Sequence, residues 1–139
     1  MALNPSFARG WHLSGTLRLF AGQFDTAIEH NEAALRLSPR ARVGASLLVI
    51  GAAHFHSLRF EEATRNLLLA IQEDPSYPLA HSYLAACYAH MGRLDEAREV
   101  VGRLHGITPE LRPRAMELRL PEHRELYLSG LRLAAGEGT

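Results

Sequence analysis

Histidine is the residue type in this chain that could most readily hold a metal ion, and the 139 residues include eight of them. His54 and His56 are close together in sequence, and His81 and His90 could lie one helix away. On a helix, residues two apart point about 200° away from each other, whereas a metal-binding pair needs a spacing of three or four. We therefore expect no metal site. His54 is predicted to be a hydrogen-bonded core residue, while His56 and His90 could titrate together near neutral pH and contact a partner.

Nucleophilic and phosphate chemistry also lack their usual residues. Cys87 lies in an apolar stretch, where a free cysteine ordinarily acts as a small hydrophobe. All fifteen basic residues are arginine, and the absence of lysine excludes Schiff-base and P-loop mechanisms. The sequence shows no Gly-rich phosphate loop, no Ser/His/Asp arrangement and no paired carboxylates in a plausible cleft. We predict a protein that is not an enzyme, with no catalytic residue and no cofactor.

The charge balance argues against nucleic acid and membranes as partners. Fifteen acidic residues match the fifteen basic ones, so no net field attracts polyanions. RNA binding through a cluster at Arg36, Arg40 and Arg42 remains an alternative, although no aromatic residues are interleaved there. The most apolar stretch, residues 43–53, is about half of the ~20 residues that a bilayer crossing needs. One cysteine and no signal-peptide pattern predict a cytoplasmic location.

An internal repeat predicts the elements that carry these residues. Prolines recur at intervals of 34, 36 and 34, namely Pro5, Pro39, Pro75 and Pro109. A second marker keeps the same phase: residues 24–27 read FDTA, 60–63 read FEEA and 94–97 read LDEA. Apolar residues at three- and four-residue spacing predict helices over residues 8–21, 24–37, 44–57, 60–73, 78–91 and 94–106. After Pro109, a short helix around 111–118 and a longer one over 122–134 are expected.

These residues resemble the tetratricopeptide repeat, whose pattern is W-x2-L-G-x2-Y, then A-x3-F, then P. The first repeat has Trp11, Ser14, Gly15, Arg18, Ala27, Asn31 and Pro39; the second has Leu47, Ile50, Gly51, His54, Ala63, Leu67 and Pro75; the third has His81, Leu84, Ala85, Tyr88, Ala97, Val101 and Pro109. The resemblance implies an all-α fold, a right-handed α-solenoid of helix-turn-helix hairpins with a C-terminal capping helix. We expect repeats at 8–41, 42–77 and 78–109, with 1–7 as the end of a missing preceding repeat and 110–139 as capping helices and tail.

Repeats of this family bind partners on the face lined by their first helices. The positions that the resemblance assigns to this groove are Arg9, His12, Thr16, Phe20, Leu48, Ala52, Phe55, His56, Ser82, Tyr83, Ala86 and His90, with Leu19, Ala45, Leu79 and Ala89 among their neighbours. Most are apolar, and the cations or amides that the family uses to clamp a peptide carboxylate are missing. Capture of a chaperone tail is therefore not expected. We predict a protein-protein interaction module that binds an apolar peptide or helix in this groove.

Two alternatives stay open. Some groove residues could simply pack against the chain's own C-terminal helix. The chain could also be a homodimerisation domain, associating through Phe7, Trp11 and Leu17 on the first hairpin, since an uncapped solenoid end tends to associate. A weaker resemblance, carried by residues 3–5, 92–97, 118–121 and 128–132, is to the C-terminal repeat region of bacterial multidomain regulators. It implies a regulatory part of a signalling protein of the class III nucleotide cyclase or winged-helix type.

Overall fold

A computed structural model describes residues 5–40, 43–108 and 118–136, and this part of the chain is all-α. Its helices are α1 (Pro5–Phe20), α2 (Phe24–Leu37), α3 (Val43–His56), α4 (Phe60–Glu73), α5 (Pro78–His90), α6 (Leu94–Ile107) and α7 (Pro121–Ala134). The predicted ranges of α2 and α4 are confirmed residue for residue. α1 begins at Pro5 rather than at residue 8, because proline is well tolerated in the first helical turn, where its missing amide hydrogen costs no hydrogen bond.

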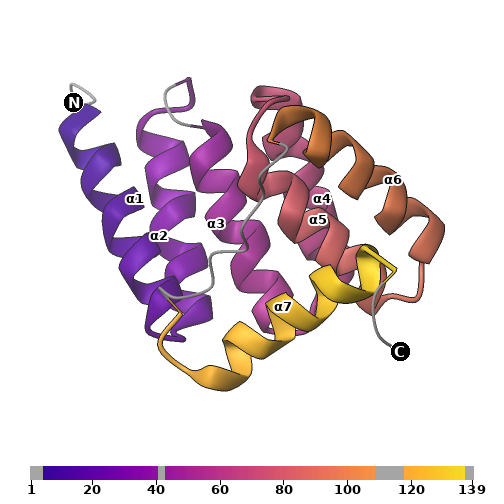
Figure 1. The fold of residues 1–139 in the computed structure, drawn as a ribbon. Coiled ribbons are helices and arrows are strands. Elements are labelled where there is room, and N and C mark those ends of the chain that lie inside the picture. The colour runs from indigo at the N-terminus through magenta and orange to yellow at the C-terminus, as the bar shows by residue number, and fades with distance from the viewer. Residues whose placement is uncertain (1–4, 41–42, 109–117, 137–139) are drawn as a thin grey trace.

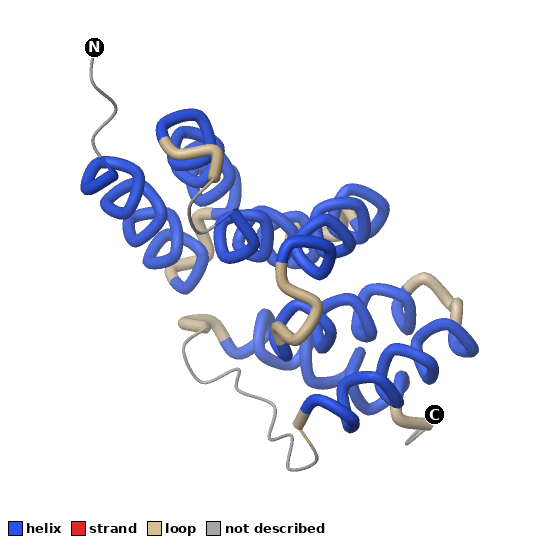
Figure 2. The backbone as a smooth tube through the Cα atoms, turned by 90° about the horizontal axis from the view of Figure 1, so that it is seen from above, coloured by secondary structure: helices blue, strands red, loops and turns tan. Residues whose placement is uncertain are grey.

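The first six helices form three antiparallel hairpins stacked side by side, as Figure 1 shows from α1 on the left to α6 on the right. Each second helix also packs on the first helix of the next hairpin, α2 on α3 and α4 on α5. Figure 2 shows the same array from above, with its helices in blue and the described loops between them in tan. The expected solenoid of hairpins is confirmed.

Each hairpin turns through one residue in the left-handed region. These residues are Gly22, Leu58 and Gly92, with φ of 83°, 64° and 79°. The amide of the following residue donates to a carbonyl five residues earlier, as in Gln23 N to Arg18 O and Arg59 N to His54 O, each at 2.8 Å. This is the Schellman ending of a helix, which favours glycine because other residues are strained at positive φ. Leu58 therefore has the one strained φ among the described non-glycine residues.

Small residues lie where the two helices of a hairpin touch, as the repeat pattern predicted. A Cβ on Gly15 would lie 2.0 Å from Asn31 Nδ2 and 3.0 Å from the Ala27 carbonyl oxygen. A Cβ on Gly51 would lie 2.8 Å from Leu67 Cγ and 3.3 Å from the Ala63 carbonyl oxygen. These contacts leave no room for a larger side chain, so the small residues set the spacing of the hairpins.

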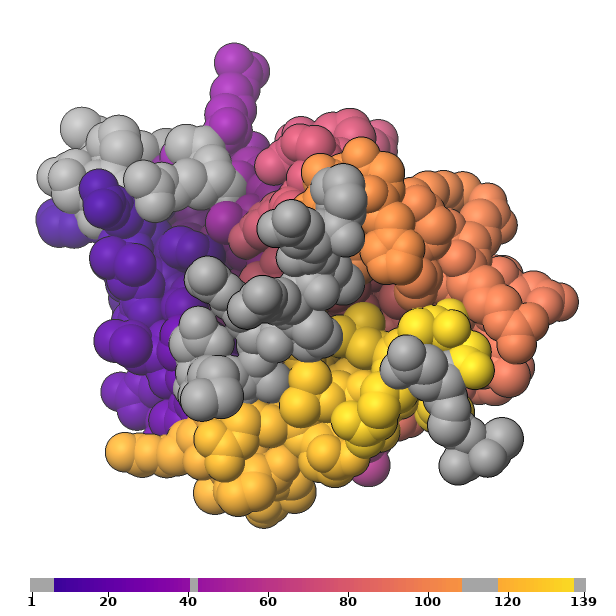
Figure 3. All heavy atoms as spheres, in the orientation of Figure 1, coloured from indigo at the N-terminus to yellow at the C-terminus, as the bar shows by residue number. Residues whose placement is uncertain are grey.

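α7 does not continue the array; it lies against α5. It buries Tyr127, Leu131 and Ala134, and a Cβ on its Gly130 would lie only 2.8 Å from the Cβ of Ala86. Figure 3 shows the amber and yellow atoms of α7 along the lower edge of this face of the molecule. The expected C-terminal capping helix is thus present. The shorter helix expected around 111–118 lies outside the described residues, apart from its last residue.

The segment that leads into α7 is attached to the first hairpin of the array. The amide of Arg119 donates to the carbonyl oxygen of Phe20 at 2.8 Å, and Leu118 is buried. At the start of α7, the ring of His123 lies 4.8 Å from that of Phe24, and a Cβ on Gly22 would lie 3.2 Å from its Cε1. The C-terminal part of the chain therefore touches both the first and the third hairpin. Within the described segments, no helix is both long and apolar enough to cross a membrane.

Candidate peptide-binding groove

The first helices of the three hairpins and the C-terminal segment enclose a pocket of about 440 Å³. α1, α3 and α5 lie next to one another in the array, so side chains on the same face of each helix meet there. The residues that line the pocket are His12, Thr16, Leu19, Phe20, Ala45, Leu48, Val49, Ala52, Tyr77, Pro78, Leu79, Ser82, Tyr83, Leu118 and Tyr127. Apolar groups make up most of the wall, with a few hydroxyl groups and one imidazole among them. Such a surface suits an apolar ligand that is oriented by a small number of polar contacts.

The imidazole of His12 has a fixed orientation on the α1 side of the pocket. Asn31 donates its amide hydrogen to the Ala27 carbonyl oxygen at 3.0 Å, so its Oδ1 is the atom that meets His12 Nδ1 at 2.8 Å. Because Oδ1 can only accept, Nδ1 carries the hydrogen. Ser46 Oγ lies 3.4 Å from the same Nδ1. His12 is therefore a polar group of fixed orientation in a mostly apolar wall.

A pair of hydroxyl groups forms the opposite wall, where α5 meets α7. Ser82 Oγ donates to the Leu79 carbonyl oxygen at 2.9 Å and lies 2.7 Å from Tyr127 OH. Since the serine hydrogen is used on Leu79, Tyr127 donates to Ser82. The ring of Tyr127 also lies 4.5 Å from that of Tyr83. Residues of α7 therefore supply part of the pocket wall.

α7 covers part of the remaining predicted groove, although not the exposed Arg9. His90 donates from Nε2 to the Leu126 carbonyl oxygen at 2.7 Å, and Ala86 lies under Gly130. Phe55 is completely buried, and His56 is 5 % exposed. These four residues were predicted to contact a partner, but the chain's own helix and core take up their contacts. The alternative that some groove residues pack against the C-terminal helix is correct for this half of the face.

His56 is held as a neutral ring in an aromatic cluster. Its Nε2 lies 3.0 Å from Tyr83 OH, and its ring stacks on Phe24 at 5.5 Å with an interplanar angle of 15°. Burial, together with a smaller effect of the nearby His123, lowers the pKa of His56 to about 3. Its Nδ1 is buried without a hydrogen-bond partner. The ring therefore stays uncharged at neutral pH, which argues against titration of His56 together with His90 there.

Sequence reasoning found much of the pocket and missed its C-terminal side. The predicted residues that line it are His12, Thr16, Phe20, Leu48, Ala52, Ser82 and Tyr83. Arg9 is exposed but is not among the lining residues. Val49, Tyr77, Pro78, Leu118 and Tyr127 were missed. Tyr127 could have been suspected from the apolar spacing of its helix, but nothing in the repeat pattern says where that helix docks.

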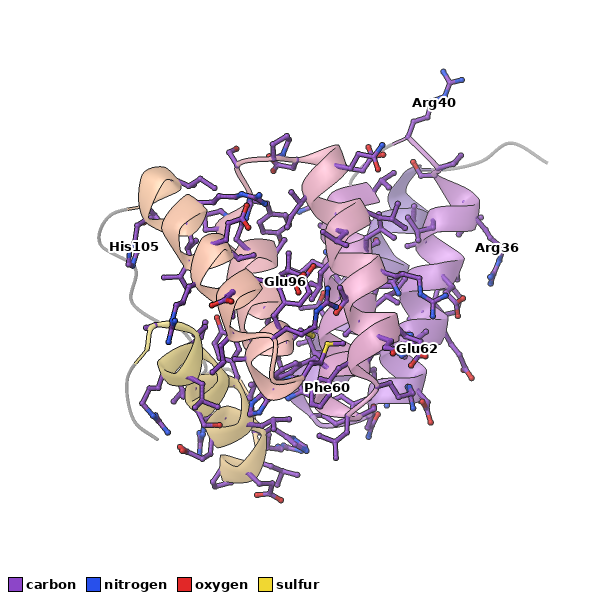
Figure 4. The ribbon with its side chains drawn as sticks, turned by 90° about the vertical axis from the view of Figure 1, so that its right-hand side faces the viewer. Arg36, Arg40, Phe60, Glu62, Glu96 and His105 are labelled. Atoms are coloured by element: carbon purple, nitrogen blue, oxygen red, sulfur yellow. The ribbon has the colours of Figure 1, made fainter. Side chains whose placement is uncertain are left out.

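The other candidate chemistries have simple structural explanations. Cys87 is buried, and burial raises the pKa of its thiol to about 12. His54 accepts a hydrogen bond at Nδ1 from Arg59 Nε at 2.9 Å and is partly buried, close to its prediction as a core residue. No group of three or more His, Cys, Asp or Glu side chains in the described segments is arranged to hold a metal. Arg36 and Arg40 point outward into solvent (Figure 4), and Arg42 lies outside the described residues.

Comparison with known proteins agrees with this geometry. Residues 54–118 match the family model described as tetratricopeptide repeat. Among solved structures, the first tetratricopeptide repeat domain of Spaghetti (RPAP3), bound to the HSP90 peptide SRMEEVD, superposes with a TM-score of 0.72 at 20% identity. The match covers 93% of this chain and 97% of that one. The solution structure of the first such domain of human RPAP3 gives a TM-score of 0.72 at 21% identity, covering 91% and 97%. No curated protein matches the sequence.

Proposed function

We propose that this chain is a tetratricopeptide repeat domain that binds an apolar segment of a partner protein in the pocket between α1, α3 and α5. The observation that carries the proposal is the pocket itself, because a wall of apolar side chains with an oriented imidazole at His12 and hydroxyl groups at Ser82 and Tyr127 suits such a ligand. The fold supports the same class of function, since the RPAP3 domain of similar structure holds a peptide. A scaffold of this kind acts by binding and not by catalysis.

The chemistry of the pocket favours an apolar ligand over an acidic tail. The peptide held by the RPAP3 domain ends in two glutamates, a valine and an aspartate. None of the described residues that line the pocket is an arginine, so this part of the wall offers an acidic peptide no fixed positive charge. An apolar helix or extended peptide would instead gain free energy by burying its side chains there.

The test is selection of peptides from a random display library on the purified chain, followed by affinity measurements on a pocket variant. Leu79 lines the pocket and is 37 % exposed, so Leu79→Asp should leave the fold intact. We expect the selected peptides to be rich in leucine and aromatic residues, and their affinity to fall about tenfold or more in this variant. Leu68→Asp is the matched control, since Leu68 is exposed on α4 and does not line the pocket. Equal affinity for both variants would refute the proposal.

The wider setting is also part of the proposal. We place the domain in the cytoplasm, as a regulatory part of a bacterial signalling protein, on the strength of the weaker sequence resemblance and the single buried thiol. Homodimerisation is the second candidate, favoured by the exposure of Phe7, Trp11 and Leu17 on α1. Light scattering over a concentration series tests homodimerisation, because a dimer would double the mass while a monomer would keep it near 15.4 kDa.

A further inference from the structure

The outer face of α1 exposes apolar side chains that the other hairpins bury. Phe7, Leu13 and Leu17 are 63 %, 49 % and 66 % exposed. When the hairpins are aligned on Gly15, Gly51 and Ala85, the position of Leu13 is taken by Val49 and Tyr83, and that of Leu17 by Ala53 and Cys87; all four of these are buried. α2 packs on α3 and α4 on α5, and Cys87 Sγ lies 3.9 Å from the Phe60 carbonyl oxygen of α4, whereas Val49 and Tyr83 also line the pocket. α1 therefore exposes the face on which, in the other hairpins, a preceding helix docks.

The covering helices show what such a face receives. α2 begins with Phe24, whose ring stacks on His56 at 5.5 Å, and α4 begins with Phe60, whose ring stacks on His90 at 5.7 Å. Phe60 is labelled at the start of its helix in Figure 4. The residue of α1 that corresponds to these two histidines is Phe20, which is half-buried. An aromatic first residue of an incoming helix would therefore meet a ring on α1 as well.

An ion pair also joins one hairpin to the next. Arg59, in the turn of the second hairpin, reaches Asp25 in the first turn of α2 at 3.1 Å and also donates to His54. In the first hairpin the two corresponding positions are Gln23 and Arg18, and Arg18 donates to Gln23 at 2.6 Å. The first hairpin therefore also has a guanidinium at this place. Arg18 supplies it from the position of His54, while Gln23 occupies the position of Arg59. α1 itself contains no acidic residue, so this guanidinium is available to a carboxylate of an incoming helix.

We propose that the outer face of α1 is a docking surface for a helix of a partner protein that begins with an aromatic residue followed by an acid and continues with an apolar stripe. Leu13 and Leu17 would pack on the stripe, Phe20 would meet the aromatic residue, and Arg18 would pair with the acid. Within this chain, α2 (FDTA) and α4 (FEEA) begin in the same way. Leu13 and Leu17 do not line the pocket, whereas Phe20 lies at the border between this surface and the groove.

The charges make a second copy of the chain a poorer occupant. Two α1 helices facing each other would bring arginines together without any carboxylate on either helix. Head-to-tail stacking would place α6 of one copy on α1 of the next. At positions where α2 has Ile28 and Leu35, however, α6 has the exposed Arg98 and His105, which that contact would bury. These charges therefore disfavour a second copy of this chain as the occupant.

The test uses the full chain and a synthetic peptide with the sequence of α4, Phe60–Glu73. A 14-residue helix is marginal in water, so the peptide carries a covalent staple between positions 65 and 69, which are both exposed in the hairpin. Anisotropy of a dye on the peptide measures binding. Emission from Trp11, the single tryptophan, reports contact at α1, because this side chain is 41 % exposed beside Phe7.

We expect saturable binding with a change in Trp11 emission, and a loss of about tenfold or more in Leu17→Asp. Arg18→Glu should weaken the native peptide, and a peptide with Glu61→Lys should recover affinity for that variant. Leu79→Asp in the groove and Leu68→Asp on α4 should bind as the unmodified chain does.

Three results would overturn the proposal. The first is no saturable binding by a chain that melts cooperatively. The second is binding that Leu79→Asp abolishes and Leu17→Asp does not, which would put the peptide in the groove. The third is a dimer in sedimentation of the chain alone that Leu17→Asp dissociates, which would make a second copy the occupant.

Discussion

Among single residues, His56 best shows how burial changes chemistry. The ring lies among Phe24, Phe55 and Tyr83, close to His123, and its pKa is lowered to about 3. In the unfolded chain the same ring has its ordinary pKa near 6.5. Between these two values the unfolded state binds a proton that the folded state does not, so acid favours unfolding.

We expect the free energy of unfolding to fall as the pH drops below about 6.5, with a contribution from His56 of at most about 1.4 kcal/mol per pH unit. Urea denaturation at a series of pH values from 7.5 to 4.5 measures this slope. In His56→Gln the slope should be smaller, because glutamine does not titrate. His54, whose pKa burial also lowers, leaves a residual slope of the same sign. His105→Gln, at an exposed position, is the control; parallel curves for His56→Gln and the unmodified chain would show that His56 does not contribute.

Among the elements, the hairpin turn of α3 and α4 carries a removable strain. Leu58 has φ of 64° and an exposed side chain, so it gains little from packing. A left-handed conformation costs an ordinary L-residue about 1–2 kcal/mol, and glycine avoids that cost at some loss of chain entropy. Leu58→Gly should therefore raise the free energy of unfolding by about 0.5–1 kcal/mol. The same measurement on Gly92→Leu, in the third hairpin, should show a decrease. A destabilised Leu58→Gly would mean that the leucine side chain contributes more than its exposure indicates.

The elements also show what the sequence can predict. The bounds of α2 follow from local signals, Gly22 before the helix and Ser38-Pro39 after it. The end of α4 follows in the same way from Asp74-Pro75, whereas its start follows from the repeat, because Leu58 is not a residue typical of turns. The inward positions of α1, α3 and α5 follow from the repeat, which is why His12, Leu48 and Ser82, predicted to share one face, all line the pocket. The position at which α7 docks is decided by tertiary contacts and not by local sequence signals. Gly130 permits the close approach of α7 to Ala86, but a glycine in a helix does not by itself indicate which surface the helix will contact.

At the scale of the whole molecule, Gly130 joins the cap to the array. An added Cβ there would lie 2.8 Å from Ala86 Cβ and 2.9 Å from His90. Gly130→Ala should overpack this contact and lower the free energy of unfolding by about 1–3 kcal/mol, while loosening α7. Gly102→Ala is the matched control, because nothing lies within 4 Å of its added Cβ and alanine is the better helix former; it should stabilise by about 0.5–1 kcal/mol. Urea denaturation with amide exchange in α7 compares them, and equal signs for the two variants would show that α7 is not tightly docked.

The link from Arg119 to Phe20 gives this molecule a folding behaviour that stacked hairpins alone would not have. In a simple solenoid each repeat contacts only its neighbours, so folding proceeds through local contacts and either end can unravel independently. Here the C-terminal segment reaches back to the first hairpin while α7 holds the third. Contacts between residues so far apart in sequence slow the search for the native state. In return, unravelling at either end has to break the same closing contacts, so the loss of one repeat is coupled to the loss of the others.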